Sequence, residues 1–184
     1  MNLSQLPPNL PIPIDDGSCN HLLNYKIPDI SLFNQNGILL RLRRYDSFRI
    51  VLYCYPMTGN PNKPLPLNWD KIPGARGCTP QNCSFRDHYD DLITCNALPI
   101  GITTQSVSEI KEMVNRLFIP YDVLSDKDLN FQKSLNLPIF KINNSVFIKR
   151  LTLIIEKSVI KKVFYPIFPP DLHIKDVLKW LKNN

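Results

Sequence analysis

The sequence contains no apolar run long enough for a membrane-spanning helix. Its first residues, MNLSQLPPNLPIPIDDG, lack the basic start and the apolar stretch of a secretory signal. It also contains no internal repeat and no low-complexity segment. These absences predict a chain with no membrane partner, and we expect a cytoplasmic location.

Histidine is scarce, and the three histidines, His21, His88 and His173, have no partner at the spacing of a metal site or of a nucleophile and its base. Each is predicted to be a surface residue. The carboxylates form no recognisable acid-base pair either. We therefore expect no bound metal and no cofactor.

The composition is that of an ordinary globular domain, since 43% of the 184 residues are hydrophobic and 21% are charged. The length suits one domain with its own core. The formal net charge of +6 raises nucleic acid as a partner. However, the basic residues are dispersed, with short groups at 41–44 and 157–162 and no interleaved aromatic motif, so no nucleic acid partner is predicted.

The chain has five cysteines without a secretory signal, which argues against a disulfide framework and favours catalytic, metal-binding or buried thiols. Cys54 falls in a predicted strand and Cys95 near a predicted helix end, so both are interpreted as small buried hydrophobic residues. Cys19 lies in the proline-rich leader. We expect no redox role for these three.

The stretch GARGCTPQNC, at residues 74–83, places a thiol where the backbone would make it reactive. An apolar run at 48–55 predicts a buried central strand ending at Pro56, and Thr79 with Pro80 predicts a helix that begins immediately after Cys78. Unpaired amide groups at a helix N-terminus favour thiolate over thiol. Arg76 adds positive charge nearby. Cys78 is therefore the candidate nucleophile.

Cys83 follows five residues later, at a spacing that a regular helix cannot bridge. Ideal geometry puts the two Cα atoms about 8.6 Å apart, whereas a disulfide rarely spans more than about 7 Å between them. If the two pair, the first turn and a half of the helix must unwind. We predict a helical reduced form and a locally unfolded oxidised form, with loss of helical circular dichroism on oxidation.

The remaining patterns predict an α/β chain. Residues 1–26 are predicted to form an irregular arm, and residues 27–184 a single domain that contains an insertion loop at 57–76. A hairpin is predicted from 30–33 and 38–42, a helix over 79–93, a strand at 98–103 and a further helix after the capping-box pair Ser106 and Glu109. A short strand at 120–124 and a helix at 128–135 follow.

The last third of the chain is rich in β-branched residues. Runs at 146–155 and 159–166 predict an antiparallel hairpin at the sheet edge, and Asp171 opens a final amphipathic helix. A central mixed sheet flanked by helices, with an N-terminal hairpin, is the thioredoxin-like fold. Arg150, in FIKRLTLII, stands at the head of an otherwise apolar strand and so needs a partner or a function.

A predicted strand ends at Pro56, a loop follows, and GCTPQNCSFRD stands at a predicted helix start. This arrangement resembles the peroxiredoxins, and among them the bacterioferritin-comigratory or Q-type group. The resemblance covers residues 27–181. It implies that Cys78 attacks a peroxide and becomes a sulfenic acid, that Cys83 resolves this to an intramolecular disulfide, and that thioredoxin or a glutaredoxin-type dithiol reduces the disulfide. It also implies that Arg150 stabilises the thiolate and the departing oxygen. Members of this group are often monomers, and we expect a monomer or a weak homodimer.

The sequence departs from the family's usual motif, Pro-x3-Thr-x2-Cys. Ala75 stands where the threonine is expected, and Pro56 lies 22 residues before Cys78 because residues 57–73 intervene. Pro56 remains a candidate for shielding the thiolate. Thr58, by folding back, or Thr79 is the candidate for the missing hydroxyl, and the sequence does not decide between them.

Three other functions compete with a thiol peroxidase. The first is a thiol-disulfide oxidoreductase without peroxidase activity, although such enzymes usually use Cys-x2-Cys. The second is a Cu(I)-binding metallochaperone module, which would need a strand-borne histidine that residues 138–155 lack. The third is a redox-inert interaction domain. A peroxide-consumption assay separates the peroxidase from all three.

Overall fold

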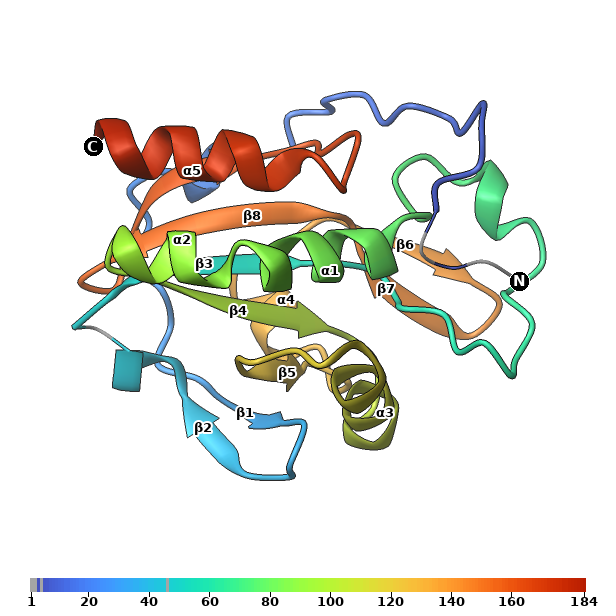
Figure 1. The fold of residues 1–184 in the computed structure, drawn as a ribbon, viewed down its shortest axis with the longest axis horizontal. Helices are drawn as coiled ribbons and strands as arrows, with labels where there is room; N and C mark the ends of the chain where they lie inside the picture. Colours follow the sequence, from blue (N-terminus) through green and yellow to red (C-terminus); the bar gives the residue numbers. More distant parts are fainter. Residues whose placement is uncertain (1–2, 4, 46) are drawn as a thin grey trace.

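A seven-stranded mixed sheet forms the centre of the computed structural model, which describes residues 3, 5–45 and 47–184 (Figure 1). The strand order is β2-β1-β5-β4-β3-β8-β9, and a second sheet pairs β6 with β7. The strands are β1 (Ser31–Asn34), β2 (Leu39–Arg41), β3 (Arg49–Cys54), β4 (Ala97–Thr103), β5 (Val123–Ser125), β6 (Ile139–Ile142), β7 (Ser145–Ile148), β8 (Leu151–Glu156) and β9 (Val159–Phe164). The α-helices are α1 (Cys78–Asp87), α2 (Tyr89–Thr94), α3 (Val107–Leu117), α4 (Asn130–Ser134) and α5 (His173–Asn183).

The sheet has the predicted thioredoxin-like arrangement. β3, β4 and β5 are parallel. β8 pairs antiparallel with β3, and β9 pairs antiparallel with β8. The predicted N-terminal hairpin is also present, because β1 pairs with β2 and Asn34 Oδ1 accepts hydrogen bonds from two amides of the turn. At α3 the predicted capping box is complete, with Ser106 and Glu109 each bonding the other's backbone N–H.

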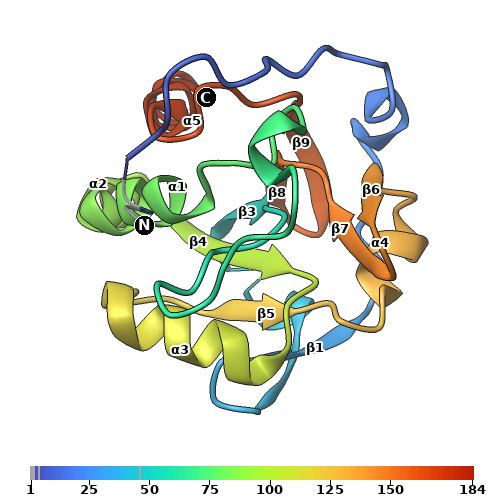
Figure 2. The same cartoon turned by 90° about the vertical axis from the view of Figure 1, so that its right-hand side faces the viewer.

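The two faces of the sheet are covered differently. One face packs against α1, α2, α3 and α5, while α4 and part of the N-terminal arm cover the other (Figures 1 and 2). Cys78 and Phe85 both belong to the helix-covered core. Within the described residues, no helix has both the length and the apolar character needed to cross a bilayer.

The N-terminal arm contains one short 3-10 helix, Asn20–Leu22, and turns at 8–9, 18–19 and 23–24. Figure 2 shows it passing over α5 and across the end of the molecule that carries the start of α1. Positions 1, 2 and 4 of the predicted arm, and position 46, lie outside the described residues.

The prediction of one helix over 79–93 is wrong at its start and in its middle. The helix begins at Cys78, with Gly77 rather than Thr79 in the capping position, and it ends at Asp87 before α2 begins. His88 leaves the helical region with φ −110° and ψ 22°. Its imidazole Nδ1 lies 2.9 Å from the Ser84 carbonyl, which also accepts the His88 backbone N–H. This shared acceptor accompanies the break between the two helices. Ile93, in α2, is 41% exposed.

The prediction of one strand over 146–155 is also wrong, and β6 was not predicted. The run divides at Lys149 and Arg150 into β7 and β8, which belong to different sheets. The Lys149 amide donates to the Pro138 carbonyl at 2.8 Å, which holds β7 against the segment leading into β6. The break turns the Arg150 side chain into the interior, where it is 3% exposed.

The prediction that all three histidines lie on the surface is wrong for His173, which is 4% exposed. Its ring lies edge-on to Phe164, and its Nε2 is 3.0 Å from Thr152 Oγ1. The amphipathic pattern of α5 is otherwise confirmed, since Ile174, Val177, Leu178 and Leu181 are buried. The burial of His173 could not be recognised from its sequence position, because a histidine beside an apolar helical face also suits the boundary of that face.

Burial, and then the charge of Arg150, lower the pKa of His173 to about 3, so the folded protein holds this ring neutral. In the unfolded chain a histidine takes up a proton near pH 6.5. The contribution to stability is therefore complete above about pH 6.5 and is lost as pH falls towards the folded pKa, by at most about 1.4 kcal/mol per pH unit. Replacing His173 by glutamine, which keeps a hydrogen-bonding side chain opposite Thr152, is expected to flatten this part of the profile.

Urea unfolding of the parent and of His173→Gln between pH 3 and pH 8 measures the difference directly. The exposed carboxylate of Asp176 lies 4.0 Å from His173 Nδ1 and partly offsets the loss once the ring is charged. Parallel profiles for the two proteins would contradict the expectation.

Candidate active site

Cys78 is the first residue of α1, and its side chain is buried, with 3% exposed. The chain enters the helix through Gly77, whose φ of 100° lies in the left-handed region. A side chain at Gly77 would collide with Pro170 and with Leu6 of the N-terminal arm. Glycine is thus required on two counts, and it sets the sulfur at the amino end of the helix, where the helix dipole favours an anion.

The guanidinium of Arg150 contacts this sulfur, which also lies 3.5 Å from the Ala75 carbonyl oxygen. Its Nη2 lies 3.1 Å from Cys78 Sγ and donates also to the carbonyls of Gly74, Ala75 and Arg76 at 3.1 to 3.4 Å. Its Nη1 donates to Gln81 Oε1. The structure therefore brings Cys78 and Arg150 together, as the resemblance implied. A permanent cation in a site of low dielectric favours the thiolate.

Cys83 lies on the same helix and is half-buried, and both cysteines are free thiols. Burial raises the pKa of Cys83 above its ordinary value, while Arg86 partly lowers it. Because α1 is helical from Cys78 through Cys83, this is the reduced form predicted from the spacing. A thiol whose pKa is raised is less often the nucleophilic thiolate at neutral pH, so Cys83 is poorly suited to attack a peroxide itself.

The structure places the two candidate threonines differently. Thr58 donates its hydroxyl to Gln105 Oε1 at 3.0 Å, and its backbone amide donates to the same oxygen at 2.8 Å. Thr79, by contrast, lines a narrow crevice together with Cys78. Pro56 is buried, and its carbonyl accepts a hydrogen bond from Thr103. Thr79, and not Thr58, is therefore among the residues that line this crevice together with Cys78.

The insertion at 57–76 and the N-terminal arm wall this crevice. Met57, Gly59, Leu65 and Trp69 from the insertion and Leu3 from the arm line it. Trp69 is only 3% exposed, and its ring lies 5.1 Å from that of Phe147. The insertion is therefore anchored in a small core of its own rather than resting on the surface. A larger cavity of about 330 Å³ lies between the arm, Gly74 and Arg150.

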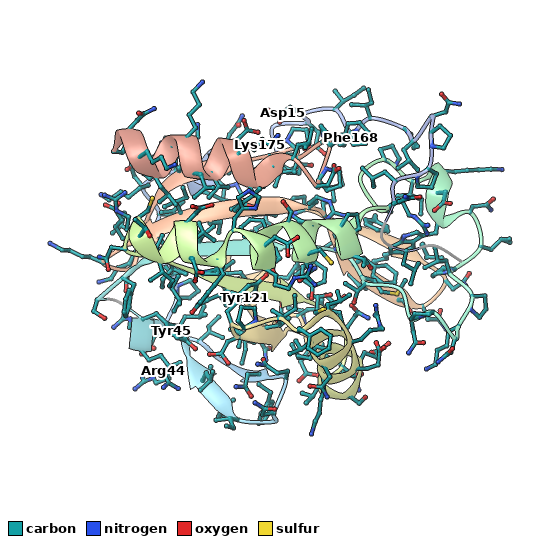
Figure 3. All side chains as sticks on the ribbon, in the orientation of Figure 1. Asp15, Arg44, Tyr45, Tyr121, Phe168 and Lys175 are labelled. Atoms are coloured by element: carbon teal, nitrogen blue, oxygen red, sulfur yellow. The ribbon has the colours of Figure 1, made fainter. Side chains whose placement is uncertain are left out.

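Four polar side chains near Cys78 were not predicted from the sequence. Gln81 and Asn82 are both fully buried on α1, and the hydroxyls of Tyr53 and Tyr121 lie beside Asn82. Figure 3 labels Tyr121, which lies between α1 and β5 in that view. Positions 81 and 82 are three and four residues after Cys78, on the helical face that also carries Phe85. Polar residues on an otherwise inward face were the signal that could have identified them.

The other cysteines are placed away from this chemistry. Cys54 is buried in β3, and burial raises its pKa well above the ordinary value. Burial, followed by the charges of Asp16 and Asp15, raises the pKa of Cys19 to about 12. Cys95 is half-buried rather than buried, so that prediction is wrong in degree. Over residues 3, 5–45 and 47–184, no three histidine, cysteine or acidic side chains cluster as metal ligands would.

The chain is similar in sequence to a known family and to several known proteins. The family model described as Redoxin matches residues 23–181. Peroxiredoxin Q of Arabidopsis thaliana, described as chloroplastic, is 29% identical over 179 residues, which cover 92% of this chain and 74% of that protein. Peroxiredoxin Q of Populus jackii, also described as chloroplastic, is 26% identical over 156 residues and is covered over 66% of its length.

Solved structures share the fold. Peroxidoxin BcpB of Mycobacterium tuberculosis superposes with a TM-score of 0.73 at 23% identity, over 88% of this chain and 96% of that one. The bacterioferritin comigratory protein of Xanthomonas campestris, whose structures are described as giving insights into its alkyl peroxide reduction activity, has a TM-score of 0.68 at 15% identity. The superposition covers 95% of this chain and 98% of the Xanthomonas campestris chain.

Proposed function

This chain belongs to the Redoxin family, and we propose on that basis that it is a thiol-dependent peroxidase of the peroxiredoxin Q type. Its substrates are hydrogen peroxide and organic hydroperoxides. The contact between Cys78 Sγ and Arg150 Nη2, at 3.1 Å, carries the proposal. The alkyl peroxide activity named for the Xanthomonas campestris protein supports the organic substrates.

The first step is a displacement at oxygen. The thiolate of Cys78 attacks one oxygen of ROOH, the O–O bond breaks, and the pair of electrons leaves with RO⁻, which takes a proton to become ROH. The sulfur is oxidised to the sulfenic acid while the peroxide is reduced. Arg150 stabilises both the thiolate and the charge that develops on the departing oxygen, because its guanidinium cannot lose its proton under these conditions.

In the second step Cys83 resolves the sulfenic acid. Its thiol sulfur attacks Cys78 Sγ, a disulfide forms, and the sulfenic oxygen leaves as water. α1 must unwind locally for this, which also exposes Cys83 and removes the burial that holds its pKa high. A dithiol reductant such as thioredoxin or a glutaredoxin-type protein then reduces the disulfide by thiol exchange.

Mass spectrometry after one equivalent of hydrogen peroxide tests the assignment of the two thiols. The parent protein is expected to carry a disulfide between Cys78 and Cys83, and Cys83→Ser is expected to stop at a sulfenic acid on Cys78. Cys95→Ser serves as the matched control, because it removes another half-buried thiol, and it is expected to behave like the parent. A disulfide that involves Cys19, Cys54 or Cys95 would overturn the assignment.

A thiol-disulfide oxidoreductase without peroxidase activity is the second candidate, since the same two thiols could exchange with protein disulfides. Peroxide consumption by the purified protein with a dithiol separates the two. We also propose a cytoplasmic location, to be tested by imaging the tagged chain, and a monomer or weak homodimer, to be tested by sedimentation.

A further inference from the structure

A buried hydrogen-bond network ties the first turn of α1 to the sheet beneath it. Asn82 Nδ2 donates to the Cys78 carbonyl at 2.8 Å, and Asn82 Oδ1 accepts from the Tyr53 hydroxyl at 2.7 Å. The Tyr121 hydroxyl lies 3.0 Å from that of Tyr53 and 3.4 Å from the Asn82 carbonyl oxygen. Asn82 and Tyr53 are fully buried, and Tyr121 is 6% exposed.

The network joins three elements that lie far apart in the sequence. Tyr53 comes from β3, and Tyr121 comes from the loop before β5. The Tyr53 ring also stacks on Phe85 of α1, with centroids 4.3 Å apart, and the Tyr121 ring stacks on Tyr89 of α2. Burial raises the pKa of both tyrosines, so both hydroxyls stay protonated and available as donors.

The position of Asn82 within this network has a direct bearing on the disulfide. Asn82 immediately precedes Cys83, and its side chain holds the carbonyl of Cys78 itself. A disulfide between the two cysteines requires their Cα atoms to come within about 7 Å, which a regular helix does not allow. The movement that brings Cys83 to Cys78 therefore breaks the bonds made by Asn82. Because the site is buried, water does not replace those bonds until the turn has opened.

We propose that Asn82, Tyr53 and Tyr121 are positioning residues that hold Cys78 in the helical, peroxide-reactive form and set the rate at which Cys83 can resolve the sulfenic acid. This inference rests on the proposed peroxidase function. The network then controls which of two reactions the Cys78 sulfenic acid undergoes. The sulfenic acid either condenses with the Cys83 thiol, releasing water, or reacts with a second ROOH, which oxidises the sulfur to the sulfinic acid and leaves as ROH.

Removing the network is expected to favour the disulfide. In Asn82→Ala and in Tyr53→Phe, one or more bonds that oppose unwinding are absent, so disulfide formation should be about threefold to tenfold faster than in the parent. The peroxide concentration that converts half of Cys78 to sulfinic acid should rise by a similar factor. The first oxidation should slow, because the helical form is less populated. Tyr45→Phe is the matched control, since it deletes a buried tyrosine hydroxyl that bonds Asp122 on the other face of the sheet.

Rapid-quench mass spectrometry across a range of hydrogen peroxide concentrations gives both ratios, and thermal unfolding gives the stability of each variant. If the two network variants lose stability like Tyr45→Phe but keep the parent's ratio of disulfide to sulfinic acid, the network is merely structural and the proposal is overturned. If Asn82→Ala does not fold, Tyr53→Phe alone decides, because it keeps the bond from Asn82 to Cys78 and removes the bonds of the Tyr53 hydroxyl to Asn82 and Tyr121.

Amide hydrogen exchange of the reduced proteins separates this inference from the peroxidase function, because it needs no peroxide. Exchange of the amides at 81–83 should be about threefold to tenfold faster in the network variants than in Tyr45→Phe. Faster exchange together with an absence of peroxide chemistry in the parent would overturn the peroxidase and retain the network as a restraint on unwinding. Unchanged exchange would overturn the network's role whatever the activity.

Discussion

Replacing Cys78 by serine is expected to lower peroxide consumption to the rate without protein, a loss of at least about three orders of magnitude. A serine hydroxyl at this position stays protonated at neutral pH, whereas a thiol at a helix N-terminus beside a guanidinium readily forms the nucleophilic thiolate. The side chains are similar in size, and Cys78 packs within the helix-covered core, so the fold should be retained. Peroxide consumption with a dithiol present measures the loss, and circular dichroism measures the fold.

Cys83→Ser is the matched comparison for this prediction. It should consume about one equivalent of peroxide quickly and then depend on direct reduction of the sulfenic acid by the added dithiol. The two cysteines are not interchangeable, because Arg150 contacts the sulfur of Cys78 while burial raises the pKa of the half-buried Cys83 thiol. If Cys78→Ser keeps a tenth or more of the parent activity, another thiol is the nucleophile and the proposed mechanism fails.

Replacing Arg150 by methionine is expected to slow the oxidation of Cys78 by about 10² to 10³, the usual cost of removing a donor that stabilises developing charge. Arg150 acts at two levels. Its guanidinium contacts the sulfur, and it also donates to three carbonyls of the chain that enters α1. Arg150→Lys keeps the charge but cannot span these acceptors with a planar fork, so its rate should lie between those of the parent and Arg150→Met.

Single-turnover oxidation in a Cys83→Ser background, followed by mass spectrometry from pH 5 to pH 9, isolates this step. Lys149→Met is the control, because it removes the adjacent cation, which pairs with Asp16 rather than with the sulfur. A rate equal to that of the Lys149→Met protein at every pH would remove Arg150 from the mechanism.

The elements that could be predicted from the sequence are those whose cause is local. The hairpin turn at Asn34 uses its own side chain, and the capping box at Ser106 is completed by a residue three positions away. The buried strands were recognisable as apolar runs between turns. The ends of these strands were not all predicted. The run at 146–155 is continuously β-rich, and nothing local distinguishes one long strand from two strands in different sheets, so the break at Lys149 was not recognised.

The candidate site divides in the same way. The reactive position of Cys78 follows from its helix start, and the need for unwinding follows from the spacing to Cys83, so both were readable without a structure. The partner of Thr58 was not, because its hydroxyl bonds Gln105, which is 47 residues away. The burial of His173 in α5 could not be predicted either, because it depends on contacts with Thr152 of β8 and Phe164 of β9.

From the sequence by itself Cys78 was predicted as the nucleophile, and most of the alternation of strands and helices was predicted as well, because these predictions depend on residues that lie close together in the chain. Only the tertiary structure decided what surrounds the sulfur. Arg150 reaches Cys78 across 72 residues, and Tyr53 reaches Asn82 across 29. Those contacts depend on which strands become neighbours in the sheet and where a strand breaks, and no pattern confined to one segment encodes that pairing.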